Sequence, residues 1–85
     1  MNRRTYFYVA SFSTPHFYFE GVGTHPHAAV DALIAGLDAH RRQYRLADPE
    51  WWREYAPNGI TSDPADGWVR EYVVGHAYRD GDVIR

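Results

Sequence analysis

The chain has 85 residues, of which 45% are hydrophobic and 16% aromatic, and it contains no cysteine. This length suits a single domain held together by aromatic packing, because disulfides and thiolate zinc sites are excluded. The formal net charge is -2 and no apolar run approaches the roughly 20 residues that cross a bilayer, so neither a wholly basic DNA-binding domain nor a membrane protein is expected.

Two strands are predicted near the start of the chain. Residues 4–12 alternate in hydrophobicity, Ser13-Thr14-Pro15 interrupt the pattern, and residues 16–22 alternate again. Such a pair is expected to form a hairpin whose more apolar face packs against a helix. That face would consist of Phe7, Val9, Phe17 and Phe19.

An amphipathic helix is predicted from Pro26 to Tyr44. Its apolar residues recur at helical spacing and form one stripe, which consists of Val30, Leu33, Ile34, Leu37 and Tyr44. Proline suits the first turn, and the dipole favours the cations of the last turn. Gly36 is expected to mark a close contact between helix and sheet, because a glycine inside a helix costs about 1 kcal/mol relative to alanine.

A short helix and a loop are predicted next. Asp48 is suited to be the N-cap and Pro49 the first residue of a helix that ends near Tyr55. Residues 58–67 are rich in glycine, proline and aspartate, which is typical of a loop.

The end of the chain predicts two more strands. Residues 68–78 are the longest β-prone run, and Asp80-Gly81 is typical of a type I′ turn before a short strand at Val83-Ile84. The expected fold is therefore α+β, an antiparallel sheet of three or four strands with one main helix on one face, in the order ββα-α-ββ.

The sequence contains no arrangement typical of an enzyme. It has no cysteine nucleophile, no GxSxG elbow and no glycine loop of the kind that holds phosphates. Its paired aspartates occur in turns, where aspartate is expected on structural grounds. We therefore expect a protein without catalytic activity and without a cofactor.

Two histidines, His25 and His27, lie where the predicted hairpin leads into the helix. They could cap backbone N–H groups, face water or bind a metal. The metal interpretation requires a third ligand, for which the candidates are Asp31, His16 and His76. No motif such as HExxH is present, so capping or a surface position is favoured and no metal site is predicted.

The second half of the chain is a candidate protein-binding region. Residues 46–85 carry eight acids against four arginines, whereas residues 1–45 carry three acids against five arginines. Adjacent Trp51 and Trp52 would point about 100° apart on a helix, so one is expected to be partly exposed unless both cover the core. Exposed aromatics anchor interfaces and carboxylates steer basic partners. The predicted partner-binding residues are Trp51, Trp52, Tyr55, Asp63, Asp66, Asp80 and Asp82.

The run HRRQYR near the end of the predicted helix supports an alternative. Arg41, Arg42 and Arg45 could contact phosphates while Tyr44 stacks on a base, although a solvated helix end has the same composition. A small nucleic-acid-binding or regulatory domain is thus the first alternative, and a histidine metal-binding protein is the second.

In format the chain resembles the anti-CRISPR proteins, a group of small proteins of phages and mobile elements. The resemblance rests on a short cysteine-free chain with hairpin strands TYFYVASF and HFYFEGVG, one helix AAVDALIAGLDAHRRQY, and acidic turns SDPADG and RDGD. It implies a non-catalytic inhibitor that occupies the DNA-binding or recruitment surface of a CRISPR effector complex. No site residues follow from it, because that group shares no motif. Without a signal-peptide pattern, we expect a cytoplasmic monomer or homodimer whose partner has a basic surface.

Overall fold

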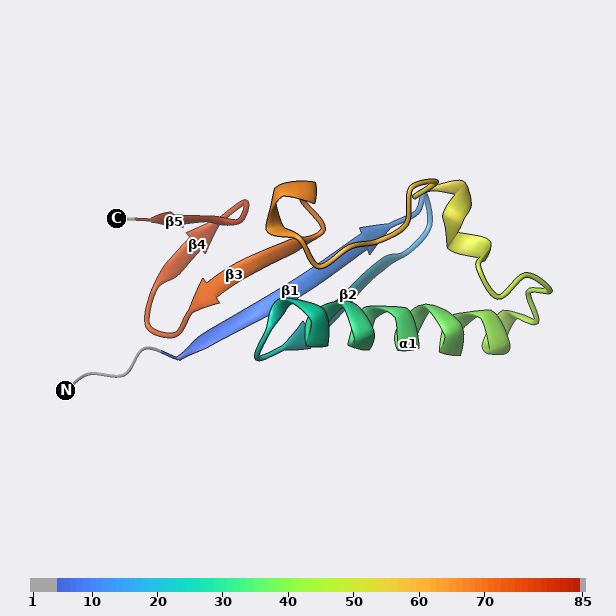
Figure 1. Cartoon of the computed structure of the whole chain (residues 1–85), viewed down its shortest axis with the longest axis horizontal. Coiled ribbons are helices and arrows are strands. Elements are labelled where there is room, and N and C mark those ends of the chain that lie inside the picture. The colour runs from blue at the N-terminus through green and yellow to red at the C-terminus, as the bar shows by residue number, and fades with distance from the viewer. Residues whose placement is uncertain (1–4, 85) are drawn as a thin grey trace.

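The computed structural model describes residues 5–84, which form a three-stranded antiparallel sheet, one long helix and a separate hairpin (Figure 1). Strand β1 (Tyr6–Ser13) lies in the centre of the sheet, between β2 (Tyr18–Gly23) and β3 (Val69–Val73). Helix α1 (Pro26–Tyr44) packs on one face of this sheet, mainly against β2 and β1. The predicted α+β fold is confirmed. The predicted strand start at residue 4 lies outside the described residues.

Helix α1 begins and ends at the residues predicted from the sequence. Its N-cap is His25, and Arg45 ends it in a left-handed conformation with φ 56°. Tyr44 is exposed, so its expected place in the buried stripe is wrong. Among residues 5–84, no helix combines the length and the apolar character that crossing a membrane requires. The buried core consists of Ala10, Phe12, Ala29, Val30, Leu33, Leu37, Trp52, Ala56 and Val69.

The helix-facing side of β1 differs from the prediction. Ala10 and Phe12 are buried, whereas Phe7 is 40% exposed. The register places Phe12 directly opposite Phe19, so these two side chains share the face that packs against α1. The prediction is therefore correct for β2 and wrong for β1. Because β1 carries apolar or aromatic side chains on both faces, alternation alone does not select one of them.

The closest approach of helix and sheet occurs at the glycines of β2. A Cβ atom on Gly21 would lie 2.8 Å from the Cα of Leu33 and nearer still to the carbonyl oxygen of Ala29. A Cβ on Gly23 would likewise lie 2.6 Å from the Ala29 amide nitrogen. Gly36, in contrast, would meet nothing within 4 Å, so its predicted contact with the sheet is wrong. The absence of side chains at these two positions of β2 lets the helix backbone pack directly against the strand.

Two short 3₁₀ helices follow α1. The first, η1 (Trp51–Glu54), starts later than the predicted helix. A turn precedes it, in which the Asp48 carboxylate accepts the Glu50 N–H at 2.8 Å and the Asp48 carbonyl oxygen accepts the Trp51 N–H at 3.1 Å. Glu50 is the N-cap residue. The second, η2 (Pro64–Asp66), was not predicted, and its N-cap is Asp63, whose side chain accepts a backbone N–H of η2 at 2.9 Å.

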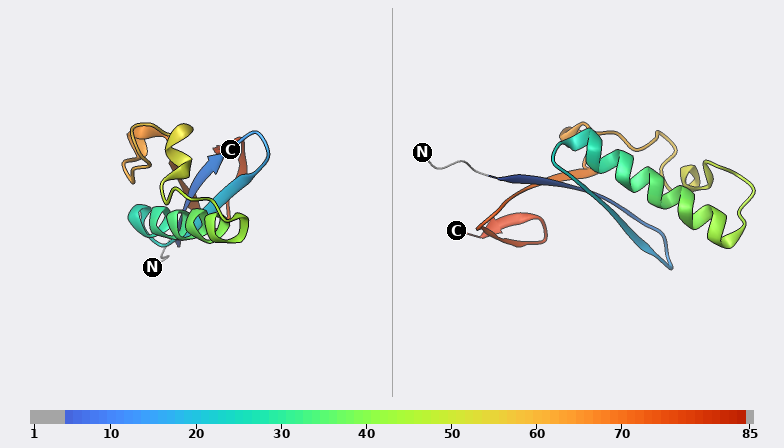
Figure 2. Two further views of the ribbon diagram at one scale, coloured as in Figure 1. Left: turned by 90° about the vertical axis from the view of Figure 1, so that its right-hand side faces the viewer. Right: turned by 90° about the horizontal axis from the view of Figure 1, so that it is seen from below.

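The strand predicted over residues 68–78 is interrupted. After β3, Gly75 adopts φ 91°, and β4 (Ala77–Arg79) then pairs with β5 (Asp82–Ile84) in a two-stranded sheet of its own. The turn residues Asp80 and Gly81 have φ values of 53° and 85°, which confirms the predicted type I′ signal. The β4-β5 hairpin lies on the side of the three-stranded sheet opposite to α1 (Figure 2).

Candidate interaction surfaces

The sheet face that α1 does not cover carries several exposed apolar and aromatic side chains. Phe7, Tyr18 and Val22 are 40%, 62% and 59% exposed. The side chains of Val9 and Tyr72, which lie among them, are partly buried. The register places them on one face, since Phe7 lies opposite Tyr72 and Val9 opposite Val22. We define the open face as Phe7, Val9, Tyr18, Val22 and Tyr72.

The β4-β5 hairpin folds over one part of the open face and is held there by polar and aromatic contacts. The Tyr78 hydroxyl accepts the Val73 N–H at 2.8 Å, and its ring packs edge-on against Tyr72 with the centroids 4.6 Å apart. From β3, Arg70 donates to the Asp80 carbonyl oxygen at 3.0 Å. Hairpin and sheet line an open cavity of about 540 Å³.

A carboxylate and a guanidinium both line this cavity. Glu20 of β2 and Arg70 of β3 lie on either side of β1, and no ion pair joins them among residues 5–84. The Tyr18 hydroxyl donates to Glu20 at 3.2 Å. Partial loss of hydration, reinforced by the Glu20 charge, raises the pKa of the Tyr18 phenol. The cavity is thus lined by two acidic residues, Glu20 and Asp80, and one basic residue, Arg70, beside tyrosine rings.

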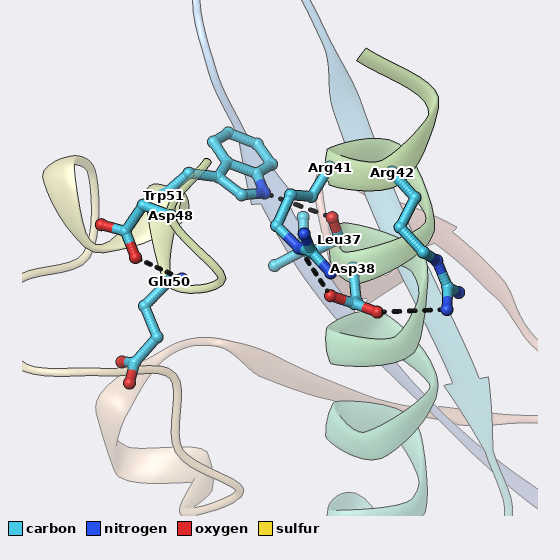
Figure 3. A network of polar contacts seen from close by, with 7 residues as sticks. All are labelled: Leu37, Asp38, Arg41, Arg42, Asp48, Glu50 and Trp51. Carbon is cyan, nitrogen blue, oxygen red and sulfur yellow. Dashed lines mark hydrogen bonds and ion pairs between the residues drawn. The ribbon is translucent and has the colours of Figure 1, made fainter. Parts of the chain in front are cut away.

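The two tryptophans of the predicted partner-binding set pack against the core. Trp52 is only 7% exposed. Trp51 is partly buried, and its indole N–H donates to the Leu37 carbonyl oxygen at 3.2 Å (Figure 3). Trp52 is thus buried and Trp51 partly exposed, as the sequence predicts for adjacent residues, and both pack against the core. Among the three aromatic residues of the predicted partner-binding set, Tyr55 is the one that is well exposed.

The four aspartates of the predicted set lie on two separate parts of the molecule. Asp63 and Asp66 belong to the η2 region, on the helix side of the sheet, whereas Asp80 and Asp82 belong to the β4-β5 hairpin on the other side (Figure 2). Asp63 caps η2, and Asp66 accepts a hydrogen bond from the Thr61 hydroxyl. The structure therefore does not gather these carboxylates into one field.

The arginines at the end of α1 are partly neutralised within the helix. Arg41 and Arg42 contact the Asp38 carboxylate at 2.9 Å and 3.6 Å (Figure 3). Arg45 is exposed. Its backbone N–H donates to the carbonyl oxygens of Arg41 and Arg42 at the end of the helix. Of these three side chains, that of Arg45 forms no ion pair with the described residues.

An aromatic cluster surrounds His40 near the same end of α1. Four rings have centroids 4.5 to 5.2 Å from that of His40, and they belong to Phe17, Phe19, Tyr44 and Trp51. The His40 ring therefore packs among aromatic side chains of β2, α1, η1 and the turn before β2. Tyr44 remains exposed at the outer side of the cluster.

The rings of His25 and His27 are exposed and stack almost in parallel, with centroids 5.1 Å apart. His25 is the N-cap residue, but its side chain makes no capping hydrogen bond. Within the described part of the chain, no group of three or more histidine, aspartate or glutamate side chains is arranged to hold a metal. The surface position predicted for these histidines is confirmed.

No family model matches the chain, and no curated protein or solved structure shows significant similarity to it.

The hydrophobic alternation of β1 favours the wrong side of this strand, so it does not predict the open face. One signal in the sequence identifies the correct side. Ala10, Gly21 and Gly23 are small residues that share one face of the hairpin, and small side chains allow a helix backbone to approach. The larger residues on the opposite face of β2, Tyr18 and Val22, are therefore the ones left exposed.

Proposed function

We propose that the protein is a non-catalytic interaction module that binds a partner protein through the open face. The observation that supports this proposal is the group of exposed Phe7, Tyr18 and Val22 side chains on a single sheet face. Exposed large apolar and aromatic side chains gathered on one face of a small domain are typical of a binding site, because leaving them in water is unfavourable. Aromatic residues in a desolvated interface commonly contribute about 2 kcal/mol or more.

The two acidic residues of the cavity below the hairpin, Glu20 and Asp80, outnumber its one basic residue, Arg70, and this favours a partner with basic residues. Glu20 lies between Tyr18 and Val22 along β2, and its carboxylate faces the cavity below the hairpin. A partner arginine or lysine could pair with Glu20 where the neighbouring rings exclude water, and charge-assisted hydrogen bonds are stronger than neutral ones. This proposal keeps the basic partner expected from the sequence and moves its binding site to the open face.

The resemblance to anti-CRISPR proteins makes a CRISPR effector complex the partner to test first. The chain would be expressed in a strain whose CRISPR system targets a reporter plasmid. Inhibition should raise plasmid survival, and Tyr18→Ala should abolish the gain. Unchanged survival would reject this class of partner and leave other proteins to be tested.

Binding affinities of variants test which surface is used. A partner isolated from the native host would be titrated with wild-type protein and with Tyr18→Ala, for which we expect a loss of about 30-fold, equivalent to about 2 kcal/mol. Tyr55→Ala is the matched control, because Tyr55 is 43% exposed but ends η1 and lies beside Phe12, whose side chain faces α1. Urea unfolding would show that each variant is folded. Weaker binding of Tyr55→Ala or of Asp63→Lys/Asp66→Lys, with Tyr18→Ala unaffected, would contradict the proposal and favour the surface predicted from the sequence.

A nucleic-acid-binding domain is the second candidate function. It is supported by the exposed Tyr44 ring, which a base could stack on, next to the exposed Arg45. A gel shift of single-stranded DNA or RNA by the wild-type protein at physiological salt, abolished in Arg41→Glu/Arg42→Glu, would favour this function over the first.

A further inference from the structure

The two edges of the three-stranded sheet differ in whether other parts of the chain contact their outward-facing backbone N–H and C=O groups. At the β3 edge, the Val73 N–H already donates to the Tyr78 hydroxyl, and η2 packs beside the start of the strand. At the other edge, no described strand pairs with the outer side of β2. An edge strand with unpaired N–H and C=O groups is a template for another strand.

The register identifies the outward-facing groups of β2. The Ser11 N–H donates to the Trp68 carbonyl oxygen on the β3 side at 3.0 Å. Backbone groups alternate along a strand, so Ala10 points its N–H and C=O toward β2, where it lies opposite Gly21. The backbone groups of Phe19, Gly21 and Gly23 therefore point toward β1. The residues that alternate with them present their N–H and C=O groups at the outer edge of the sheet, and these residues are Tyr18, Glu20 and Val22.

We infer that this edge accepts an extended segment of a partner protein, which adds antiparallel to β2 as a fourth strand. The segment carries an arginine or lysine opposite Glu20 and apolar residues opposite Tyr18 and Val22. This inference rests on the proposed function, since the side chains of the added strand would extend the open face. Main-chain hydrogen bonds provide the attachment in this mode, and alternate side chains provide the specificity.

Charge complementarity selects a basic segment over a second copy of this chain. Two β2 strands paired about Glu20 would use all three outward-facing residues of each copy, but they would place the two Glu20 carboxylates directly opposite each other, which is destabilising. A basic residue at that position forms a favourable cross-strand pair instead. The cavity of about 540 Å³ beside Glu20 has room for a long side chain.

A designed peptide tests the inference without the natural partner. The probe has seven residues, with a central arginine, valine two residues away on each side and threonine elsewhere. Binding would be followed by amide chemical shifts of the isotope-labelled protein up to millimolar peptide. We expect shifts concentrated in β2, and at least 5-fold weaker binding when glutamate replaces the peptide arginine. N-methylation of the central arginine should abolish binding, whereas N-methylation of a neighbouring threonine, whose N–H points away from β2, should preserve most of it.

A charge swap provides the decisive control. Glu20→Arg should bind the glutamate peptide better than the arginine peptide, whereas Glu54→Arg, the same charge change at exposed η1, should keep the wild-type preference. Absence of binding, a preference that Glu20→Arg leaves unchanged, or equal effects of the two N-methylations would overturn the inference. A wild-type dimer in sedimentation that Val22→Pro converts to monomer would also overturn it, because a second copy would then occupy the edge.

The partner assay separates this inference from the proposed function. Val22→Pro removes one outward N–H and leaves the ladder with β1 intact, which edge strands tolerate. Binding that is lost in Tyr18→Ala but retained in Val22→Pro would overturn strand addition and keep the open face as the binding site. Full binding of both variants would contradict the proposed function itself.

Discussion

Adding one methyl group at two different glycines should change stability in opposite directions. Gly21→Ala places a Cβ against the backbone of α1 at Ala29 and Leu33, which cannot move aside as a flexible side chain can. Gly36→Ala places a Cβ where nothing lies within 4 Å. The first change should push the helix away from the sheet, whereas the second should only reduce the conformational freedom of the unfolded chain.

The expected magnitudes follow from these contacts. Overpacking a well-packed site typically costs 1–3 kcal/mol, and contact with main-chain atoms places Gly21→Ala at about 3 kcal/mol. Alanine is favoured over glycine inside a helix by about 1 kcal/mol, so Gly36→Ala should gain about that amount. The two variants should thus differ by about 4 kcal/mol. An 85-residue chain has a total stability of roughly 4–13 kcal/mol, so this difference is readily measurable.

Urea unfolding followed by circular dichroism gives both free energies under identical conditions. The midpoint should fall for Gly21→Ala and rise for Gly36→Ala, with similar m-values. A Gly21→Ala variant as stable as the wild type would show that α1 does not rest on β2 in this register. Destabilisation by Gly36→Ala would show that this part of the helix faces the core.

Three further predictions concern the core, a tyrosine and the histidines. Leu33→Asp should prevent folding, because an unpaired buried charge costs several kcal/mol, and a cooperatively unfolding variant would contradict this. The hydrogen bond from Tyr8 to Glu71 raises the pKa of Tyr8 above its ordinary 10.0, so its stabilisation is complete below pH 10 and is lost as the pH rises through the folded-state pKa. Tyr8→Phe should therefore lose stability less steeply than the wild type above pH 10 in urea titrations, and equal slopes would refute the assignment. Protein purified without a tag should contain no stoichiometric zinc, nickel or manganese, and one metal per chain that is lost in His25→Ala/His27→Ala would disprove that expectation.

Local sequence signals predicted the elements whose stability is local. Helix α1 has both of its ends and its 3.6-residue period in the sequence, and the Asp80-Gly81 turn requires only positive φ at two residues. The break between β3 and β4 was less visible, because Gly75 lies within a run of β-prone residues and becomes a turn only when Tyr78 folds back onto the Val73 N–H. Tertiary contacts of this kind leave no periodic pattern.

The candidate binding surface was harder to predict than the fold. Tryptophan is a residue type that is common in interfaces. In this structure, however, the Trp51 indole N–H donates to the Leu37 carbonyl oxygen, and Trp52 is buried. Which face of β1 is open depends on the register with β2 and on where α1 can approach. The exposure of Tyr18 agrees with the alternation of β2, whereas the exposure of Phe7 follows only from the register that places Ala10 beside Gly21 under the helix.

Site-specific photocrosslinking in the native host tests the central claim most directly. A benzophenone amino acid would replace Tyr18 on the open face, Tyr55 on the helix side or Tyr44 at the end of α1, one at a time. All three residues are exposed tyrosines, so the comparison is matched in chemistry. The account predicts a defined protein adduct from position 18 and none from the other two. A protein adduct from position 55 alone, or a nucleic-acid adduct from position 44 alone, would contradict it.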